Sequence, residues 1–66
     1  MTPHEEFCLK TATSFSAVRG RTPRQRVRFD AVTMDAAIEY AAQFADGRTM
    51  IYAINDLGNS AHIRNA

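Results

Sequence analysis

The fold is decided by residues 33–47, which read TMDAAIEYAAQFADG. Thr33 can cap the first turn of a helix, because its hydroxyl accepts a backbone N–H that the turn leaves unpaired. Asp35 adds negative charge where the helix dipole favours it, and Gly47 suits the left-handed position that ends a helix. The apolar residues between these ends recur at helical spacing and form one stripe: Met34, Ala37, Ile38, Ala41, Phe44 and Ala45. We therefore predict an amphipathic helix that lies close against a sheet, since much of its stripe is alanine.

A β-hairpin is predicted after this helix. Residues 49–54 (TMIYAI) are rich in β-forming side chains, and residues 60–64 (SAHIR) return along them. Residues 55–59 (NDLGN) fit a type I turn in which Gly58 takes the positive φ of a bulge. The turn predicts three opposed pairs: Asn55 with Asn59, Ala53 with Ala61, and Ile51 with Ile63. We expect the four apolar residues of these pairs to lie beneath the helix.

Two further strands are predicted before the helix, from alternation between polar and apolar residues. Residues 26–31 (RVRFDA) form the later one, with three inward side chains, Val27, Phe29 and Ala31. Residues 6–11 (EFCLKT) form the earlier one, with two inward side chains, Phe7 and Leu9. We interpret residues 13–25 as a connecting loop, because several of its residues are loop signals: Ser14, Ser16, Gly20 and Pro23. The alternative is that this segment extends the two strands into a longer, irregular hairpin.

The predicted order is β-β-α-β-β, a two-layer α+β architecture in which one helix covers one face of a four-stranded, mainly antiparallel sheet. We expect the first strand to lie between the second and the third, which gives the strand order 2-1-3-4. The 66 residues predict one small domain over 1–66, with 1–5 and 65–66 frayed. A domain of this size buries only about 60% of its unfolded surface. Cys8 is the only cysteine, so extra stability must come from close packing or oligomerisation and not from a disulfide within the chain.

We expect no cofactor, no metal site and no enzymatic activity. One cysteine and two histidines, His4 and His62, lack the paired spacing of zinc ligands. The three glycines are isolated and form no phosphate-binding loop, and no catalytic motif is present. The first residues lack the basic start and apolar run of a signal peptide, and no segment is apolar enough to span a membrane. We therefore expect a cytoplasmic protein with no membrane partner.

The basic residues are concentrated, although the net charge is only +1. Five of the eight fall between positions 19 and 28: Arg19, Arg21, Arg24, Arg26 and Arg28. The predicted registers place some of these, with further basic and aromatic residues, on the sheet face that the helix leaves open: Lys10, Arg26, Arg28, Tyr52, His62 and Arg64. Single-stranded RNA or DNA is held by basic side chains on its phosphates and aromatic rings on its bases. Tyr52 and His62, as cross-strand neighbours, are the expected stacking platform. The leading hypothesis is a binding module for an anionic partner, with nucleic acid ahead of an acidic protein.

The alternative is a structural or regulatory homodimer. Met50, Tyr52 and Ile54 form a small apolar patch on the open face, and such patches often mark interfaces. An edge strand, either residues 60–64 or the basic strand, offers a second route to a dimer. Alternating arginines also occur on solvated strand faces that bind nothing. Salt dependence separates the two functions, because phosphate binding weakens steeply with salt and an apolar interface does not.

Overall fold

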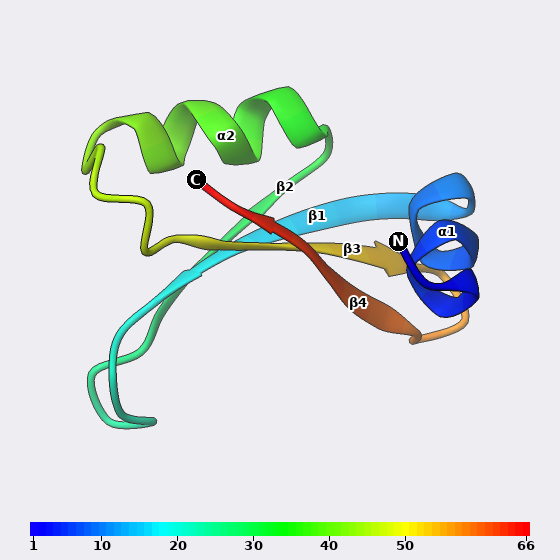
Figure 1. Cartoon of the computed structure of the whole chain (residues 1–66), viewed down its shortest axis with the longest axis horizontal. Helices are drawn as coiled ribbons and strands as arrows, with labels where there is room; N and C mark the ends of the chain where they lie inside the picture. The colour runs from blue at the N-terminus through cyan, green and yellow to red at the C-terminus, as the bar shows by residue number, and fades with distance from the viewer.

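The computed structural model describes all residues from 1 to 66. Its elements are α1 (Pro3–Lys10), β1 (Ala12–Arg19), β2 (Val27–Ala31), α2 (Met34–Ala42), β3 (Met50–Asn55) and β4 (Ser60–Asn65). The four strands form one antiparallel sheet in the order β2-β1-β3-β4 (Figure 1). The α+β class and the strand order are therefore as predicted, although the strand that lies in second place comes from a different segment.

The helix α2 begins as the sequence indicates. The Thr33 hydroxyl accepts the N–H of Ala36 at 3.1 Å, and Ala37 and Ala41 are buried against the sheet. The helix ends at Ala42, short of the predicted stop near Gly47. The chain leaves the helical path through Ala45, which takes a left-handed φ of 50°. The hydrogen bonds that Asp46, the next residue, accepts from Arg19 and from the Arg48 N–H explain why the chain turns there.

The prediction of a strand at residues 6–11 is wrong, because residues 6–10 belong to α1 and Thr11 is its C-cap. Thr2 caps this helix: its hydroxyl accepts the Glu5 N–H at 3.2 Å, and the Glu5 carboxylate accepts the Thr2 N–H at 3.3 Å. Pro3 occupies the first helical position, where its missing N–H costs nothing. This capping box fixes a helix start, and it outweighs six residues of polar and apolar alternation. Of the residues expected to be frayed at this end, 3–5 form the first turn of α1 and Thr2 is its cap.

The loop predicted over residues 13–25 is also wrong for its first half. Ala12–Arg19 form β1, the central strand that pairs with both β2 and β3. The alternative of a longer hairpin is correct in that β1 extends the pairing with β2 to Arg19, but residues 6–11 take no part in it. Phe15 and Ala17 face the helices, and Ser16 and Val18 face the other side. Small polar residues in a central strand obscured the alternation, and the turn itself is confined to residues 20–26.

Both helices cover the same face of the sheet, so the other face is open (Figure 1). Helix α2 packs on β1, β2 and β3 around Ile51, and α1 packs on β3 and β4 around Cys8. Phe15 lies between the two clusters and contacts both. Only 12 of the 66 residues are buried, so the core is small and an additional interface would add appreciably to the buried surface. Neither helix has the length and apolar character that a membrane span requires.

The β3–β4 hairpin follows the predicted register near its turn. The Asn55 N–H donates to the Asn59 carbonyl at 3.0 Å, Gly58 has a φ of 86°, and Ala53 lies opposite Ala61. The predicted pairing of Ile51 with Ile63 is wrong, because a bulge shifts the register and places Arg64 opposite Ile51. Beyond the bulge, Ala66 exchanges two backbone hydrogen bonds with Thr49, so the pairing continues to the last residue.

Candidate nucleic-acid interface

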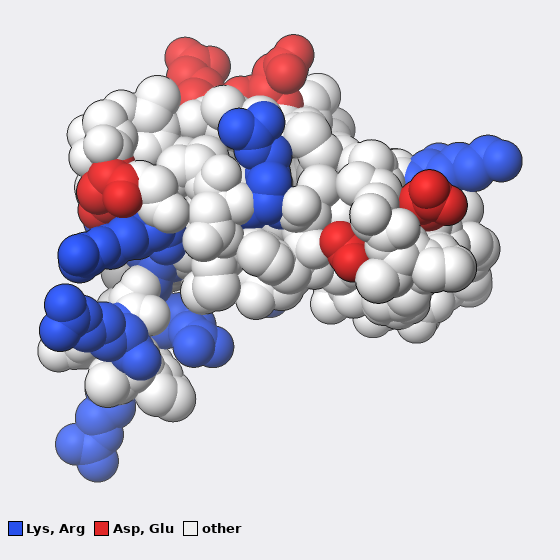
Figure 2. Space-filling model, in the orientation of Figure 1, with Lys and Arg blue, Asp and Glu red and all other residues white.

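The arginine cluster lies on the β1–β2 hairpin, at one end of the molecule. Figure 2 shows the basic side chains gathered there, with acidic side chains over α2. Arg21, Arg24 and Arg26 belong to the turn between the strands and are exposed. Arg19 and Arg28 lie in β1 and β2. The hairpin thus concentrates positive charge at one end of a molecule whose net charge is only +1.

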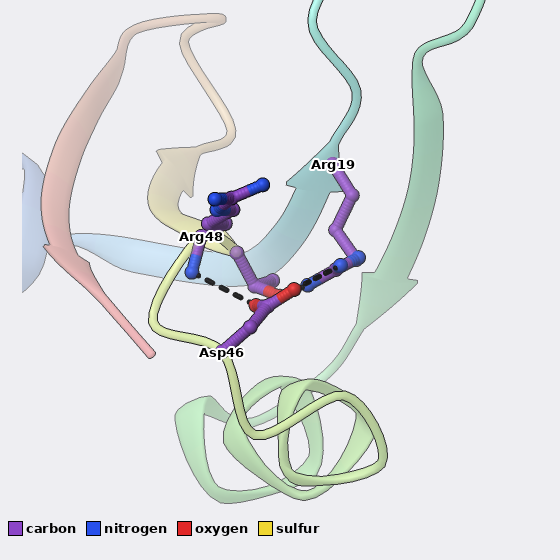
Figure 3. A network of polar contacts seen from close by, with 4 residues as sticks. Arg19, Asp46 and Arg48 are labelled. Atoms are coloured by element: carbon purple, nitrogen blue, oxygen red, sulfur yellow. Dashed lines mark hydrogen bonds and ion pairs between the residues drawn. The ribbon is translucent and has the colours of Figure 1, made fainter.

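Arg19 is engaged within the fold. Its guanidinium donates to both carboxylate oxygens of Asp46, at 2.8 and 2.6 Å, and to the Thr49 hydroxyl at 2.8 Å (Figure 3). It also lies over the Phe44 ring, 3.9 Å from its centroid. The hydrogen bonds from Arg19, with that from the Arg48 N–H, hold the pKa of Asp46 well below its usual range. We expected Arg19 to contact an anionic partner from a loop. It lies instead in β1, where its ion pair with Asp46 links this strand to the α2–β3 loop.

Arg28 is also paired, although it remains exposed. Its Nε donates to the Asp30 carboxylate at 2.7 Å, and the Ser16 hydroxyl donates to the same oxygen at 2.6 Å. The hydrogen bond from Ser16, followed by that from Arg28, lowers the pKa of Asp30. All three side chains lie on the open face of the sheet, where Ser16 is the register partner of Asp30. Arg28 can still contact a ligand, but with part of its charge compensated.

A basic hollow lies at the base of the hairpin. It has a volume of about 380 Å³, and its five lining residues include no hydrophobic side chain: Arg19, Gly20, Arg21, Gln25 and Arg48. Small-molecule sites are lined mainly by apolar side chains, so this hollow suits a phosphate group better than an apolar ligand. Gly20 allows the close approach of the two sides of the turn, since its φ is 124° and Gln25 and Arg26 lie directly against it.

Arg48 is a site residue that the sequence analysis missed. Its backbone N–H donates to Asp46 at 3.0 Å, while its guanidinium points away from that carboxylate (Figure 3). Arg48 is 20 residues beyond the arginine cluster in sequence, and the α2–β3 loop returns it to the hollow. The only sequence signal was a basic residue directly after the predicted helix end.

A second depression, the sheet groove, lies on the open face next to the hairpin. Its volume is about 240 Å³, and it is lined by Ser16, Val18, Arg26, Arg28, Tyr52, Ile54 and Ser60. This volume is below the roughly 300–1,000 Å³ of typical small-molecule pockets. Arg26 and Arg28 at its β2 side place positive charge beside the apolar floor that Val18 and Ile54 provide. The groove is therefore better suited to part of a polymer than to an enclosed small ligand.

Tyr52 and His62 are neighbours across β3 and β4, as predicted. Their ring centroids are 5.6 Å apart and the rings are tilted by 57°. The Tyr52 hydroxyl reaches the Met50 sulfur at 3.8 Å, and His62 Nε2 lies 2.6 Å from the Asn65 amide oxygen. His62 is exposed, whereas Met50, Tyr52 and Ile54 are half-buried, so the apolar patch is partly covered by its own neighbours.

Three residues expected on the open face lie elsewhere. Lys10 ends α1, at the opposite end of the sheet from the hairpin (Figure 1). Arg64 shares the helix-covered side with Ile51, because directly opposed residues point to one face and the bulge moved Arg64 into that position. Cys8, which alternation with the inward Phe7 and Leu9 assigned to the open face, is instead fully buried beneath α1, with its sulfur 3.7 Å from His4 Nε2. The open face is consequently less basic than predicted. The positive charge that remains on this face, from Arg26 and Arg28, lies at the hairpin end.

No group of three or more His, Cys, Asp and Glu residues is arranged to hold a metal ion. The chain matches no protein-family model, and no curated protein and no solved structure shows significant similarity to it.

Proposed function

We propose that the protein is a non-enzymatic module that binds single-stranded nucleic acid along the basic hairpin and into the sheet groove. The observation that carries this proposal is a set of arginines at the hairpin end without carboxylate partners. The two ion pairs of the molecule engage Arg19 and Arg28. Four other arginines near the hairpin have no such partner: Arg21, Arg24, Arg26 and Arg48. Several unpaired cations at one end of the molecule favour a partner that carries several negative charges in a row.

The two depressions suit different parts of a nucleotide. The hollow between Arg21 and Arg48 is lined by cationic and polar residues with no hydrophobic side chain, so it can hold a phosphate. The sheet groove, which Arg26 also lines, offers the Tyr52 ring and an apolar floor, and the His62 ring lies next to Tyr52, so the groove can receive a base. Stacking on an aromatic ring contributes roughly 1–3 kcal/mol per base and tolerates any sequence. Unpaired bases are required for this contact, which is why a single strand is the proposed ligand.

The test is fluorescence anisotropy with short labelled RNA, single-stranded DNA and duplex DNA. At about 50 mM salt, where electrostatic binding is strong, the parent should bind the single strands and weaken as salt rises. The variant Arg21→Gln/Arg24→Gln/Arg26→Gln should lose most of this affinity and show a shallower salt slope. The matched control, Lys10→Gln/Arg64→Gln, removes two charges outside the hairpin and should bind like the parent. The proposal fails if the parent binds neither polymer or if both variants are weakened equally.

A protein–protein interface is the second candidate function. The sheet groove is floored by Val18, Tyr52 and Ile54, and neither helix covers it. A second copy or an acidic protein that covered this face would extend the small core. If the partner is a second copy that covers the apolar residues, Tyr52→Glu should abolish association by burying an unpaired carboxylate, and rising salt should change the affinity little. We also propose a cytoplasmic location, which the single free cysteine supports.

A further inference from the structure

The β2 edge of the sheet is apolar and uncovered. β2 is the first strand in the sheet order, so one side of its backbone has no partner. Val27 is 55% exposed, Phe29 is 38% exposed, and Val32 directly after the strand is 82% exposed. The Phe29 ring stacks on Tyr40 of α2, with centroids 4.4 Å apart and an interplanar angle of 5°. Exposed strand edges with apolar side chains are sites of pairing with another chain.

The sequence of β2 is complementary to itself. It reads Val27-Arg28-Phe29-Asp30-Ala31, with opposite charges placed symmetrically about Phe29. If two copies pair antiparallel about a twofold axis at Phe29, each Arg28 lies opposite Asp30 of the second copy. The two Phe29 rings then face one another on the helix side, with Tyr40 stacked behind each. Opposed residues of opposite charge and opposed aromatic residues both stabilise a strand pair.

Other registers are less favourable. Directly opposed residues in an antiparallel pair point to the same face of the sheet. The twofold axis must therefore lie where one residue of β2 opposes its own copy, because any other axis would oppose residues that point to different faces. An axis at Arg28 would oppose the two Arg28 side chains, and an axis at Asp30 would oppose the two Asp30 side chains. Like charges in opposed positions destabilise a strand pair. We propose that the protein forms a homodimer through antiparallel β2–β2 pairing centred on Phe29.

This dimer is a single eight-stranded sheet with all four helices on one face. The antiparallel pairing directs the two basic hairpin turns toward opposite ends of the interface. It leaves the basic hollow of each copy uncovered. The dimer shares Arg28 with the sheet groove, but it does not require nucleic-acid binding and its test is the oligomeric state of the protein alone. The proposed partner of this edge is a second copy of the chain, because the charges of β2 are complementary to those of an antiparallel second β2.

Light scattering after size-exclusion chromatography gives the first test. The parent should have twice the 7.4 kDa mass of one chain. Arg28→Asp places a new carboxylate opposite Asp30 of the second copy, so dimerisation should weaken by at least about tenfold. Arg28→Asp/Asp30→Arg exchanges the two charges and should restore the dimer, while also preserving the pair within each chain. A monomeric parent, a dimeric Arg28→Asp variant or a monomeric double variant each overturns the proposal.

Cysteine cross-linking tests the register independently if a charge variant fails to fold. Phe29→Cys places two thiols directly opposite each other, within the Cα separation of about 4.4–6.8 Å that a disulfide needs. Mild oxidation should convert it to a covalent dimer on a non-reducing gel. Val27→Cys is the control, because the two copies of residue 27 are offset by four residues, or roughly 13 Å. The native Cys8 is buried and should not cross-link. Equal cross-linking at positions 27 and 29, or none at 29, overturns the register.

Discussion

Arg19 and Asp46 form a bidentate ion pair that joins the end of β1 to the loop after α2, with N–O distances of 2.8 and 2.6 Å. Bidentate geometry fixes both partners more strictly than a single contact. The pair holds the loop so that Phe44 lies under the guanidinium and Arg48 reaches the basic hollow. Arg19 is therefore structural, and it positions Arg48, which has no ion-pair partner of its own.

We predict that Arg19→Gln lowers the melting temperature, whereas Arg21→Gln does not. The first change removes the bidentate pair, the hydrogen bond to Thr49 and the contact with Phe44. The second removes an exposed side chain without an ion-pair partner. Thermal unfolding followed by circular dichroism distinguishes the two variants. Equal melting temperatures would show that the pair adds nothing to stability.

A pH dependence follows from the lowered pKa of Asp46. Its pKa lies well below the ordinary 3.8 because Arg19 and the Arg48 N–H donate to the carboxylate. A carboxyl group with a lowered pKa stabilises the fold fully above the pKa of the unfolded chain. That contribution is lost as the pH falls from about 4 toward the folded-state pKa. We expect the free energy of unfolding to fall less steeply with acid in Asp46→Asn than in the parent. The two should show the same slope above about pH 5. The prediction would be contradicted if the free energies of unfolding of parent and variant, measured by chemical denaturation, fell equally steeply below about pH 4.

The parts of the fold that sequence predicts correctly are those fixed by short-range signals. The Thr33 cap specifies where α2 begins, and the Gly58 turn specifies the pairing of Ala53 with Ala61. The end of α2 is set by a distant arginine, and the register beyond Tyr52 is changed by a bulge. Neither feature leaves a local pattern, so neither could be predicted.

The candidate site was predicted only in part, for the same reason. The hairpin arginines are adjacent in sequence, and their grouping was evident. Arg48 joins them through tertiary structure, whereas Arg64 and Lys10 are separated from them by the β4 bulge and by the helical state of α1. Only the position of Lys10 had a local signal, because the Thr2–Glu5 capping box indicates a helix where the alternation at residues 6–11 indicates a strand.

The two helix caps should contribute similarly to stability. We expect Thr2→Ala and Thr33→Ala each to lower the free energy of unfolding by about 1 kcal/mol, because each leaves a helical N–H without its partner. Replacement by serine, which keeps the hydroxyl, should restore most of the loss. Urea denaturation measures both effects. A Thr2→Ala variant as stable as the parent would indicate that α1 does not depend on its capping box.

The last prediction concerns the glycine that shapes the basic hollow. A methyl group on Gly20 would lie 2.6 Å from the Gln25 carbonyl oxygen and 2.7 Å from the Arg26 Cα, and the φ of 124° is itself unfavourable for alanine. Gly20→Ala must therefore distort the hairpin turn, at a cost of roughly 1–3 kcal/mol for the backbone strain. Gly47→Ala is the matched control, since its φ is also positive but no atom lies within 4 Å of an added methyl.

We expect Gly20→Ala to be the less stable variant in urea denaturation. It should also bind oligonucleotides more weakly than Gly47→Ala, because the distortion moves Arg21 and Gln25 at the rim of the hollow. Equal stability would mean that the turn can relax around the methyl group. Unchanged binding despite lost stability would mean that the hollow contributes nothing to nucleic-acid affinity and that the exposed arginines of the turn act without it.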